Sequence, residues 1–230
     1  MKFNKKLLQG TLIKRYKRFF VDIKYKNKTI TAHCPNSGSM MGLLNKGNIV
    51  WFSESDNPKR KLKYTLQIVV INNKPVGINT HLSNKIVLES LKNKKIKNLI
   101  RFTNIKSEIK FSDNTRFDFL ISNNKEKCFL EVKNVTLLRQ DNIAEFPDAI
   151  TTRGTKHLKK LIEAKRKGYE SCLLYLIQRE DCKTFKIAKD IDQEYKIAFS
   201  KALKNGVMVL CYDCKLSNEG IKLNNQINYA

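Results

Sequence analysis

TRFDFLI at residues 115–121 and FLEVK at residues 129–133 decide the fold of the second half of this chain. Each is a short apolar run, rich in aromatic and branched residues and bounded by turn-forming residues, which is the pattern of a β-strand. The polar sequence NNKE at residues 123–126 lies between them and is typical of a hairpin loop. We therefore predict two strands that pair as a hairpin.

Charged residues interrupt both apolar runs. Side chains two residues apart on a strand share a face, so Glu131 and Lys133 point the same way, and in a hairpin Asp118 can lie across from them. Burying charge is costly unless the groups pair or bind a metal ion. Two carboxylates suit Mg²⁺, with Mn²⁺ as a substitute, and a nearby lysine can orient water or stabilise a developing anion. The three residues predict a catalytic site for phosphodiester hydrolysis; the alternative is an ordinary Glu–Lys ion pair.

Further motifs follow in order along the chain. They are HCPNSGSM at residues 33–40, RFDF at 116–119, EVKNVTL at 131–137, FPDA at 146–149, TRG at 152–154 and HL at 157–158. In these motifs, nearly from end to end, the chain resembles the sugar fermentation stimulation protein A (SfsA) family. The resemblance implies a DNA-binding protein linked to sugar (maltose) metabolism. It also implies an OB-like N-terminal domain and a C-terminal domain of the PD-(D/E)xK nuclease type, in which Asp118 and Glu131 hold the metal and act with Lys133.

Residues 1–78 are predicted to form the OB-like β-barrel. Short strands alternate there with turn residues, which is typical of a small barrel. The expected strands are residues 8–16, 19–25, 29–34, 49–53 and 64–71. Basic strands interleaved with aromatic residues suit a surface on which bases stack and lysines hold phosphates, although several of these aromatics would serve equally well as core.

Residues 79–230 are predicted to form a nuclease-like α/β (α+β mixed) domain. The apolar periodicity indicates helices at residues 83–91, 155–167 and 193–204, and buried strands at 172–177 and 207–212. Helices between apolar strands imply crossovers that cover a mixed sheet. The hairpin that carries Asp118 and Glu131 would be the antiparallel part of that sheet.

The chain is strongly basic, with a formal net charge of +24 in 230 residues. Residues 1–78 alone have 16 Lys and Arg against 3 Asp and Glu, a net charge of +13. Such a charge attracts polyanions, of which DNA is the usual one and an anionic membrane surface the other candidate. Because lysine far outnumbers arginine, we expect non-specific, phosphate-led DNA binding. The same lysine, asparagine and isoleucine bias is also what an AT-rich coding sequence produces.

Other global features point to a reduced, cytoplasmic protein. No stretch approaches the ~20 consecutive apolar residues of a membrane span, and the N-terminus lacks the apolar segment of a signal peptide. Six cysteines are present, of which only Cys211 and Cys214 have the spacing of a metal or redox pair, with no second pair to complete a zinc site. Ordinary reduced thiols are the expectation.

Three segments outside the hairpin are candidates for nucleic-acid binding. The turn Asn36, Ser37, Gly38 and Ser39 can hold a phosphate through backbone N–H groups and hydroxyls; the alternative is a tight turn in which Ser39 caps a short helix at residues 40–44. The basic loop of Lys59, Arg60 and Lys61 is either a phosphate contact or a solvated loop. Arg153 and Lys156 lie at the start of the second predicted helix, where anions bind readily; Asp148 is a candidate N-cap there.

A third carboxylate would complete the hypothetical metal site. Nucleases of this type often add an acidic residue from the first helix, which makes Glu89 a candidate, although its helical position is off the apolar face. Glu108, upstream of the Asp118 strand, is the alternative. His157 is expected to be a contact or structural residue, since no partner histidine lies near it in the sequence, and His33 and His81 are read as structural.

Three functions are therefore compatible with the sequence. The preferred one is a DNA-binding, Mg²⁺-dependent nuclease. The second is a non-enzymatic DNA-binding regulator of sugar metabolism on a nuclease-like scaffold, against which the intact Asp118, Glu131 and Lys133 argue, because buried charges without a task tend to be lost. The third is an RNA-binding protein, since OB barrels bind either polymer.

Overall fold

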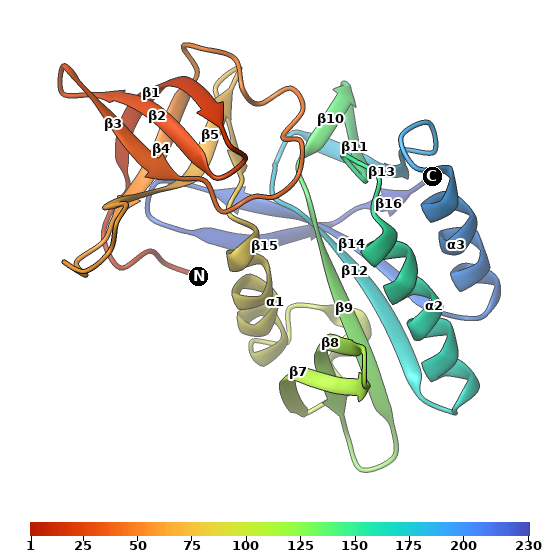
Figure 1. The fold of residues 1–230 in the computed structure, drawn as a ribbon. Coiled ribbons are helices and arrows are strands. Elements are labelled where there is room, and N and C mark those ends of the chain that lie inside the picture. The colour runs from red at the N-terminus through yellow and green to blue at the C-terminus, as the bar shows by residue number, and fades with distance from the viewer.

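The computed structural model describes all 230 residues and shows a β-barrel packed on a mixed α/β domain (Figure 1). The barrel strands are β1 (Leu8–Tyr16), β2 (Phe20–Tyr25), β3 (Lys28–His33), β4 (Ile49–Glu54), β5 (Tyr64–Ile71) and β6 (Lys74–Gly77). They follow the order β3-β2-β1-β4-β5-β6, and a second pairing of β3 with β5 closes the first five strands into a barrel. The predicted OB-type barrel is confirmed.

Alternation along the strands builds the barrel interior. Val21 and Ile23 on β2, and Val50 and Phe52 on β4, are fully buried, whereas their neighbours along each strand are not. This is the period of two expected for a sheet with one face in the core. Strand β5 is instead buried along most of its length, because Ile68 packs into the second domain beneath the first helix.

The second domain is organised around a six-stranded sheet of order β15-β14-β12-β9-β8-β7. Its strands are β7 (Asn104–Ser112), β8 (Thr115–Ser122), β9 (Lys127–Val135), β12 (Glu170–Ile177), β14 (Met208–Leu216) and β15 (Ile221–Gln226). The central strands β9, β12 and β14 are parallel, and antiparallel strands flank them on both sides. The predicted mixed sheet, with the β8–β9 hairpin as an antiparallel part, is confirmed.

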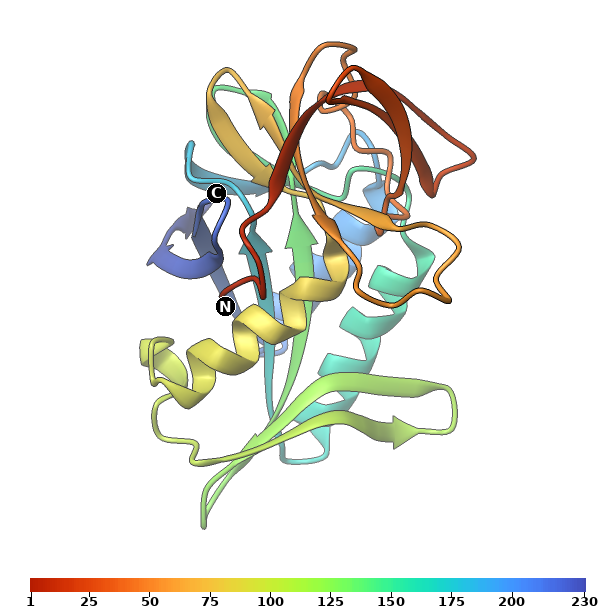
Figure 2. The ribbon, with the colours of Figure 1, turned by 90° about the vertical axis from the view of Figure 1, so that its left-hand side faces the viewer.

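Three helices cover this sheet. Helix α1 (Ser83–Lys92) lies on one side, and α2 (Thr152–Arg166) and α3 (Gln193–Lys204) lie on the other, as Figures 1 and 2 show. Each side has its own core, and β12 serves both: Leu174 packs toward α1, whereas Leu173 and Tyr175 pack toward α2 and α3. This double burial explains why β12 reads as a continuous apolar run.

The structure corrects two local expectations near the domain junction. Helix α2 begins at Thr152 instead of residue 155, and its N-cap is Thr151, whose side chain accepts a hydrogen bond from the Gly154 N–H, so Asp148 is not the cap. Residues 40–44 form turns and no helix, and Met40 has a φ of 54°. A left-handed residue at that position is incompatible with the first turn of a helix.

Sequence reasoning also missed several short elements. A second, four-stranded sheet consists of β10 (Leu137–Gln140), β11 (Asn142–Phe146), β13 (Cys182–Ile187) and β16 (Asn228–Tyr229). Two 3-10 helices, η1 (Thr80–Leu82) and η2 (Lys97–Leu99), flank α1. All six cysteines are buried and free, and none of the helices is long and apolar enough to span a bilayer.

Candidate functional site

The β8–β9 register brings the predicted carboxylates together. Phe119 pairs with Leu130 in this antiparallel hairpin, so Asp118 lies opposite Glu131 one position further along. The Asp118 carboxylate is fixed by two donors: the Val132 N–H to Oδ2 at 2.7 Å and the Asn84 side-chain amide to Oδ1 at 2.8 Å. Asn84 comes from α1, so this carboxylate joins the first helix to the hairpin.

Glu131 is the most buried charged group of the site, with 3% of the residue exposed. Its Oε1 accepts a hydrogen bond from Lys133 Nζ at 2.7 Å and also contacts His157 Nδ1. Lys133 Nζ lies 3.2 Å from the same histidine nitrogen. The other oxygen, Oε2, is buried and has no hydrogen-bond partner. Glu131 therefore has one oxygen with two partners and one buried oxygen with none.

The two carboxylates have opposite electrostatic environments. Burial, together with the negative charge of Glu131, raises the pKa of Asp118 to about 6, against hydrogen bonds from Val132 and Asn84 that act to lower it. Burial also acts to raise the pKa of Glu131, but Lys133 and His157 overcome it and hold that pKa below its usual value. Two buried groups whose pKa values are pushed apart mark a candidate functional site.

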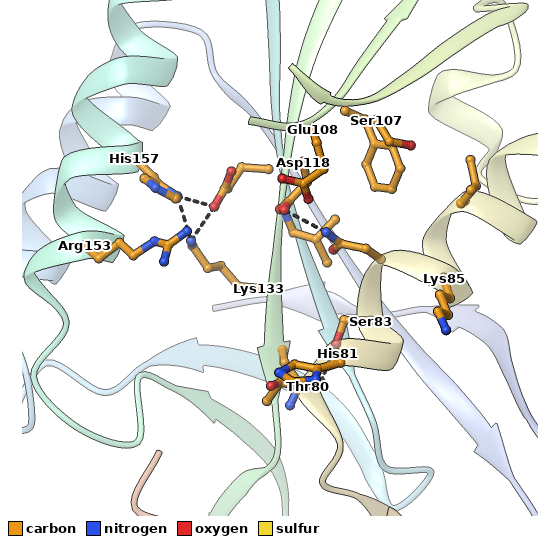
Figure 3. A pocket seen from close by; sticks show the side chains of 16 residues that line it. Thr80, His81, Ser83, Lys85, Ser107, Glu108, Asp118, Lys133, Arg153 and His157 are labelled. Atoms are coloured by element: carbon orange, nitrogen blue, oxygen red, sulfur yellow. Dashed lines mark hydrogen bonds and ion pairs between the residues drawn. The ribbon is translucent and has the colours of Figure 1, made fainter. Parts of the chain in front are cut away.

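A cavity of 630 Å³ opens over these groups. Figure 3 shows Arg153 and His157 on α2 at one side of it, and Ser83 and Lys85 on α1 at the other, with Asp118 and Lys133 between them. Glu131 also lines this cavity. Both helices thus present polar side chains to one recess, although they cover opposite faces of the sheet. The recess has two carboxylates at its floor and cations at its rim.

The two proposed third carboxylates have different locations. Glu108 on β7 lines the cavity, and one of its oxygens is 3.9 Å from the Arg116 guanidinium. Glu89 does not join them: it lies outside the cavity and pairs with the Met1 ammonium at 2.9 Å. This location fits the expectation, drawn from its position on the helix, that Glu89 is solvated and lies off the apolar face.

The predicted phosphate contacts are spread over three places. Arg153 lines the main cavity, and Lys156 lines an adjoining cavity of 520 Å³. The turn of Asn36, Ser37 and Gly38 borders a separate 240 Å³ cavity at the domain junction. Lys59, Arg60 and Lys61 lie on an exposed barrel loop, where the Arg60 guanidinium donates to the Thr65 hydroxyl at 2.7 Å.

The turn at residues 36–39 is held by other parts of the protein. The Arg15 guanidinium donates to the carbonyl oxygens of Asn36 at 2.7 Å and Gly38 at 3.0 Å. The Ser39 hydroxyl donates to the backbone oxygen of Asp148 at 2.8 Å, across the domain boundary. The backbone of this segment is thus held in place, but it does not cap a helix at residues 40–44 as the alternative expected, and its phosphate binding stays a prediction.

Two residues of the site were missed by sequence reasoning. Asn84 orients Asp118 and lies on α1, a helix that the sequence predicted only from its apolar face. His81 was read as structural, yet it lines the main cavity. An asparagine and a histidine beside a helix start carry no specific signal in a single sequence, so only the tertiary fold identifies them.

The donor set fits a hard divalent cation. No group of three or more His, Cys, Asp or Glu side chains is arranged to hold a metal ion. Mg²⁺, however, is commonly bound through one or two carboxylates and keeps several waters. Glu131, with its unpartnered Oε2, and Asp118 line the same cavity and match that requirement. Burial and the negative charge of Glu131 raise the pKa of Asp118, so the charge of this carboxylate is poorly compensated within the chain.

Comparison with known proteins decides the family. The model of the "Sugar fermentation stimulation protein RE domain" matches residues 81–220, and that of the "SfsA N-terminal OB domain" matches residues 13–78. The chain belongs to the sugar fermentation stimulation protein family. Curated homologues of that name are 55% identical in Pelagibacter ubique, over 99% of this chain and 98% of the relative, and 44% identical in Paramagnetospirillum magneticum, over 97% and 95%.

A solved structure of the family has the same fold. The structure of Pyrococcus furiosus SfsA in complex with Ca²⁺ superposes with a TM-score of 0.90 at 24% identity, covering 100% of this chain and 98% of that one. In this member of the SfsA family, Asp118, Glu131 and Lys133 all lie within the stretch matched by the RE domain model.

Proposed function

We propose that this protein is a cytoplasmic, DNA-binding nuclease that hydrolyses phosphodiester bonds with Mg²⁺, or with Mn²⁺ in its place. One observation carries the proposal: Glu131, whose Oε2 is buried and unpartnered, lines the same cavity as Asp118, with the Lys133 ammonium 2.7 Å from the other Glu131 oxygen. Burying charge is costly unless the groups pair or bind a ligand, and Asp118, unlike Glu131, has no cationic side chain in contact with it.

Asp118 and Glu131 are the residues that would hold the cation. When bound, Mg²⁺ would supply Lewis-acid polarisation of a phosphoryl oxygen and a water of lowered pKa. Pyrococcus furiosus SfsA was solved in complex with Ca²⁺, another hard cation with oxygen ligands, which supports this choice of metal class.

The remaining side chains have defined tasks in the proposal. Lys133 is held by Glu131, so its charge is fixed where an attacking water or a developing phosphorane oxygen would need it. His157 contacts the same Glu131 oxygen and restricts its rotamer. Arg153 faces the cavity without an ion-pair partner, and a guanidinium in that position suits a backbone phosphate.

A non-enzymatic DNA-binding regulator of sugar metabolism is the second candidate. Its supporting observation is that Glu131, Lys133 and His157 contact one another, as a purely structural ion cluster would. The net charge of +24 serves DNA binding equally well in either case. Two features favour the enzyme over the regulator: the unpartnered Glu131 Oε2 and the second carboxylate, Asp118.

Purified protein incubated with supercoiled plasmid and with linear single-stranded DNA, in Mg²⁺, Mn²⁺ or EDTA, tests the proposal. We expect metal-dependent cleavage that Asp118→Ala and Lys133→Ala abolish while gel-shift binding survives. Glu180→Ala, which removes an exposed carboxylate that lines neither of the two cavities beside Asp118, is the matched control and should cleave normally. Binding without cleavage in any metal would leave the regulator, and preference for RNA in competition would favour the RNA-binding alternative.

A further inference from the structure

The space around the carboxylates continues beyond the main cavity. The 630 Å³ cavity and the adjoining 520 Å³ cavity share Glu108, Asp118, Arg153 and His157 in their walls. The two are therefore contiguous, and the Asp118 carboxylate lies where they meet. We call the part toward α1 the α1 arm, and the part between α2 and the β7–β8 hairpin the hairpin arm.

Each arm has its own cation. Lys85 of α1 stands in the α1 arm, and Lys156 of α2 stands in the hairpin arm. Neither has an ion-pair partner within 4.0 Å, in contrast to Lys110 of the hairpin arm, which pairs with Asp113 at 2.7 Å. Cations left unpaired on both sides of a carboxylate pair are available for phosphates on both sides of it.

The chemistry of the hairpin arm is suited to a sugar–phosphate backbone. Its wall contains no apolar side chain. Its cations include Lys156, which has no ion-pair partner, and the exposed Arg116, whose paired carboxylate oxygen on Glu108 is 3.9 Å away. Such a lining offers donors to phosphate and sugar oxygens and no platform for a base, so binding there would be tolerant of sequence.

We propose that a single strand of DNA lies across the carboxylates through both arms, so that the enzyme cuts within a strand and needs no chain end. The inference rests on the proposed nuclease function. A site built for chain ends needs phosphate contacts on one side only, whereas Lys85 and Lys156 flank Asp118 on two sides. The Glu131 side chain is only 4% exposed, so the phosphate must enter a recess. A flexible single strand can follow it there, whereas a stiff duplex presents its phosphates on a cylinder.

Circular DNA separates this inference from the function on which it rests. Wild-type protein with Mg²⁺ is incubated with a single-stranded circle, the same strand made linear, and a relaxed duplex circle. We expect the single-stranded circle to be opened at the rate of the linear strand, and at least tenfold faster than the duplex circle. Cleavage of the linear strand alone would overturn the inference and keep the nuclease, and no cleavage of any substrate would refute the proposed function. Equal cleavage of both circles would refute the single-strand assignment.

Salt dependence of binding tests the two arms independently of cleavage. In EDTA, we expect Lys85→Gln and Lys156→Gln each to reduce the slope of log Kd against log salt by about 0.7, the value for one phosphate contact with a single strand. Lys159→Gln is the matched control, because this exposed lysine lies on α2 and lines neither arm. A slope that falls for only one of the two variants would show a one-sided site and overturn the proposal.

Discussion

Replacing Asp118 by asparagine should make the metal-free protein more stable. In the structure this carboxylate is buried beside a second one, and no cation of the chain contacts it directly. An asparagine oxygen can still accept the Val132 N–H, and the Asn84 amide can turn to offer its own oxygen to the new NH₂ group. The substitution thus removes a buried charge while the local hydrogen bonds survive.

The magnitude follows from the pKa of Asp118. A rise from the ordinary 3.8 to about 6 corresponds to about 3 kcal/mol of preference for the neutral carboxyl in the folded state. Because the folded pKa is the higher one, the unfolded chain loses this proton first as the pH rises. The free energy of unfolding of the wild type therefore falls by up to about 3 kcal/mol as the pH rises from roughly 4 to 6, and the fall is complete above pH 6. Asp118→Asn has no such carboxyl group, so its stability does not fall in this way.

Thermal unfolding in EDTA at pH 5 and pH 8 measures this effect. At pH 8 we expect Asp118→Asn to melt up to roughly 6–12 °C above wild type, since 1 kcal/mol moves the Tm of a chain of this size by about 2–4 °C. At pH 5 the difference should be smaller. Asp113→Asn, whose carboxylate is 93% exposed, is the control and should change stability by less than about 0.5 kcal/mol.

Added Mg²⁺ should reverse the order of the two proteins. Wild type should gain stability with metal concentration, whereas Asp118→Asn, with one carboxylate fewer, should gain little. At a concentration 1,000 times Kd the gain is about 4.1 kcal/mol, which exceeds the roughly 3 kcal/mol advantage of the variant in EDTA. If Asp118→Asn were no more stable than wild type at pH 8 in EDTA, with the control unchanged, the idea of repulsion between buried carboxylates would be refuted.

Three further predictions concern the scaffold. The buried hydroxyls of Tyr175 and Tyr195 are 2.7 Å apart, so Tyr195→Phe leaves the Tyr175 hydroxyl without a partner. It should lower the free energy of unfolding in urea by about 1–3 kcal/mol, and the double variant with Tyr175→Phe should recover most of that loss. Burial raises the pKa of the Cys128 thiol to about 12 and all six cysteines are buried, so a thiol reagent at pH 8 should label none of them before unfolding; rapid labelling would contradict the packing. Gly38→Ala would put a Cβ 2.5 Å from the Asp148 carboxylate and should lower stability by about 1–3 kcal/mol; an unchanged Tm would argue against that contact.

The sequence predicted those strands and helices whose own residues show a clear apolar pattern. The predicted residues 8–16, 64–71 and 193–204 coincide with β1, β5 and α3. Strand β7 was missed because it lies at the edge of its sheet with most of its side chains exposed, so its sequence has no apolar alternation. The four short strands of the second sheet have too few residues for any periodicity to show.

The residues of the candidate site also differ in how far the sequence alone predicts them. Asp118, Glu131 and Lys133 come together through one hairpin, and hairpin pairing is readable from a short stretch of sequence. Asn84 and His157 come from helices on opposite faces of the sheet, and only the packed domain brings Asn84 to Asp118 and His157 to Glu131. A contact between residues so far apart in the chain leaves no periodic trace in a single sequence.

The domain junction gives a structural reason for two of the motifs. The HCPNSGSM turn of the barrel and the FPDA segment of the second domain meet there: the Asp148 carboxylate accepts the Met40 N–H, and its backbone oxygen accepts the Ser39 hydroxyl. Asp148 is only three residues before Thr151, the N-cap of α2, and α2 carries Arg153 at the cavity. The contact that fixes the barrel therefore also fixes the start of the helix that faces the carboxylates. A DNA strand held by the basic barrel would consequently meet the carboxylate site at a constant separation, which a flexible linker between the two domains would not provide.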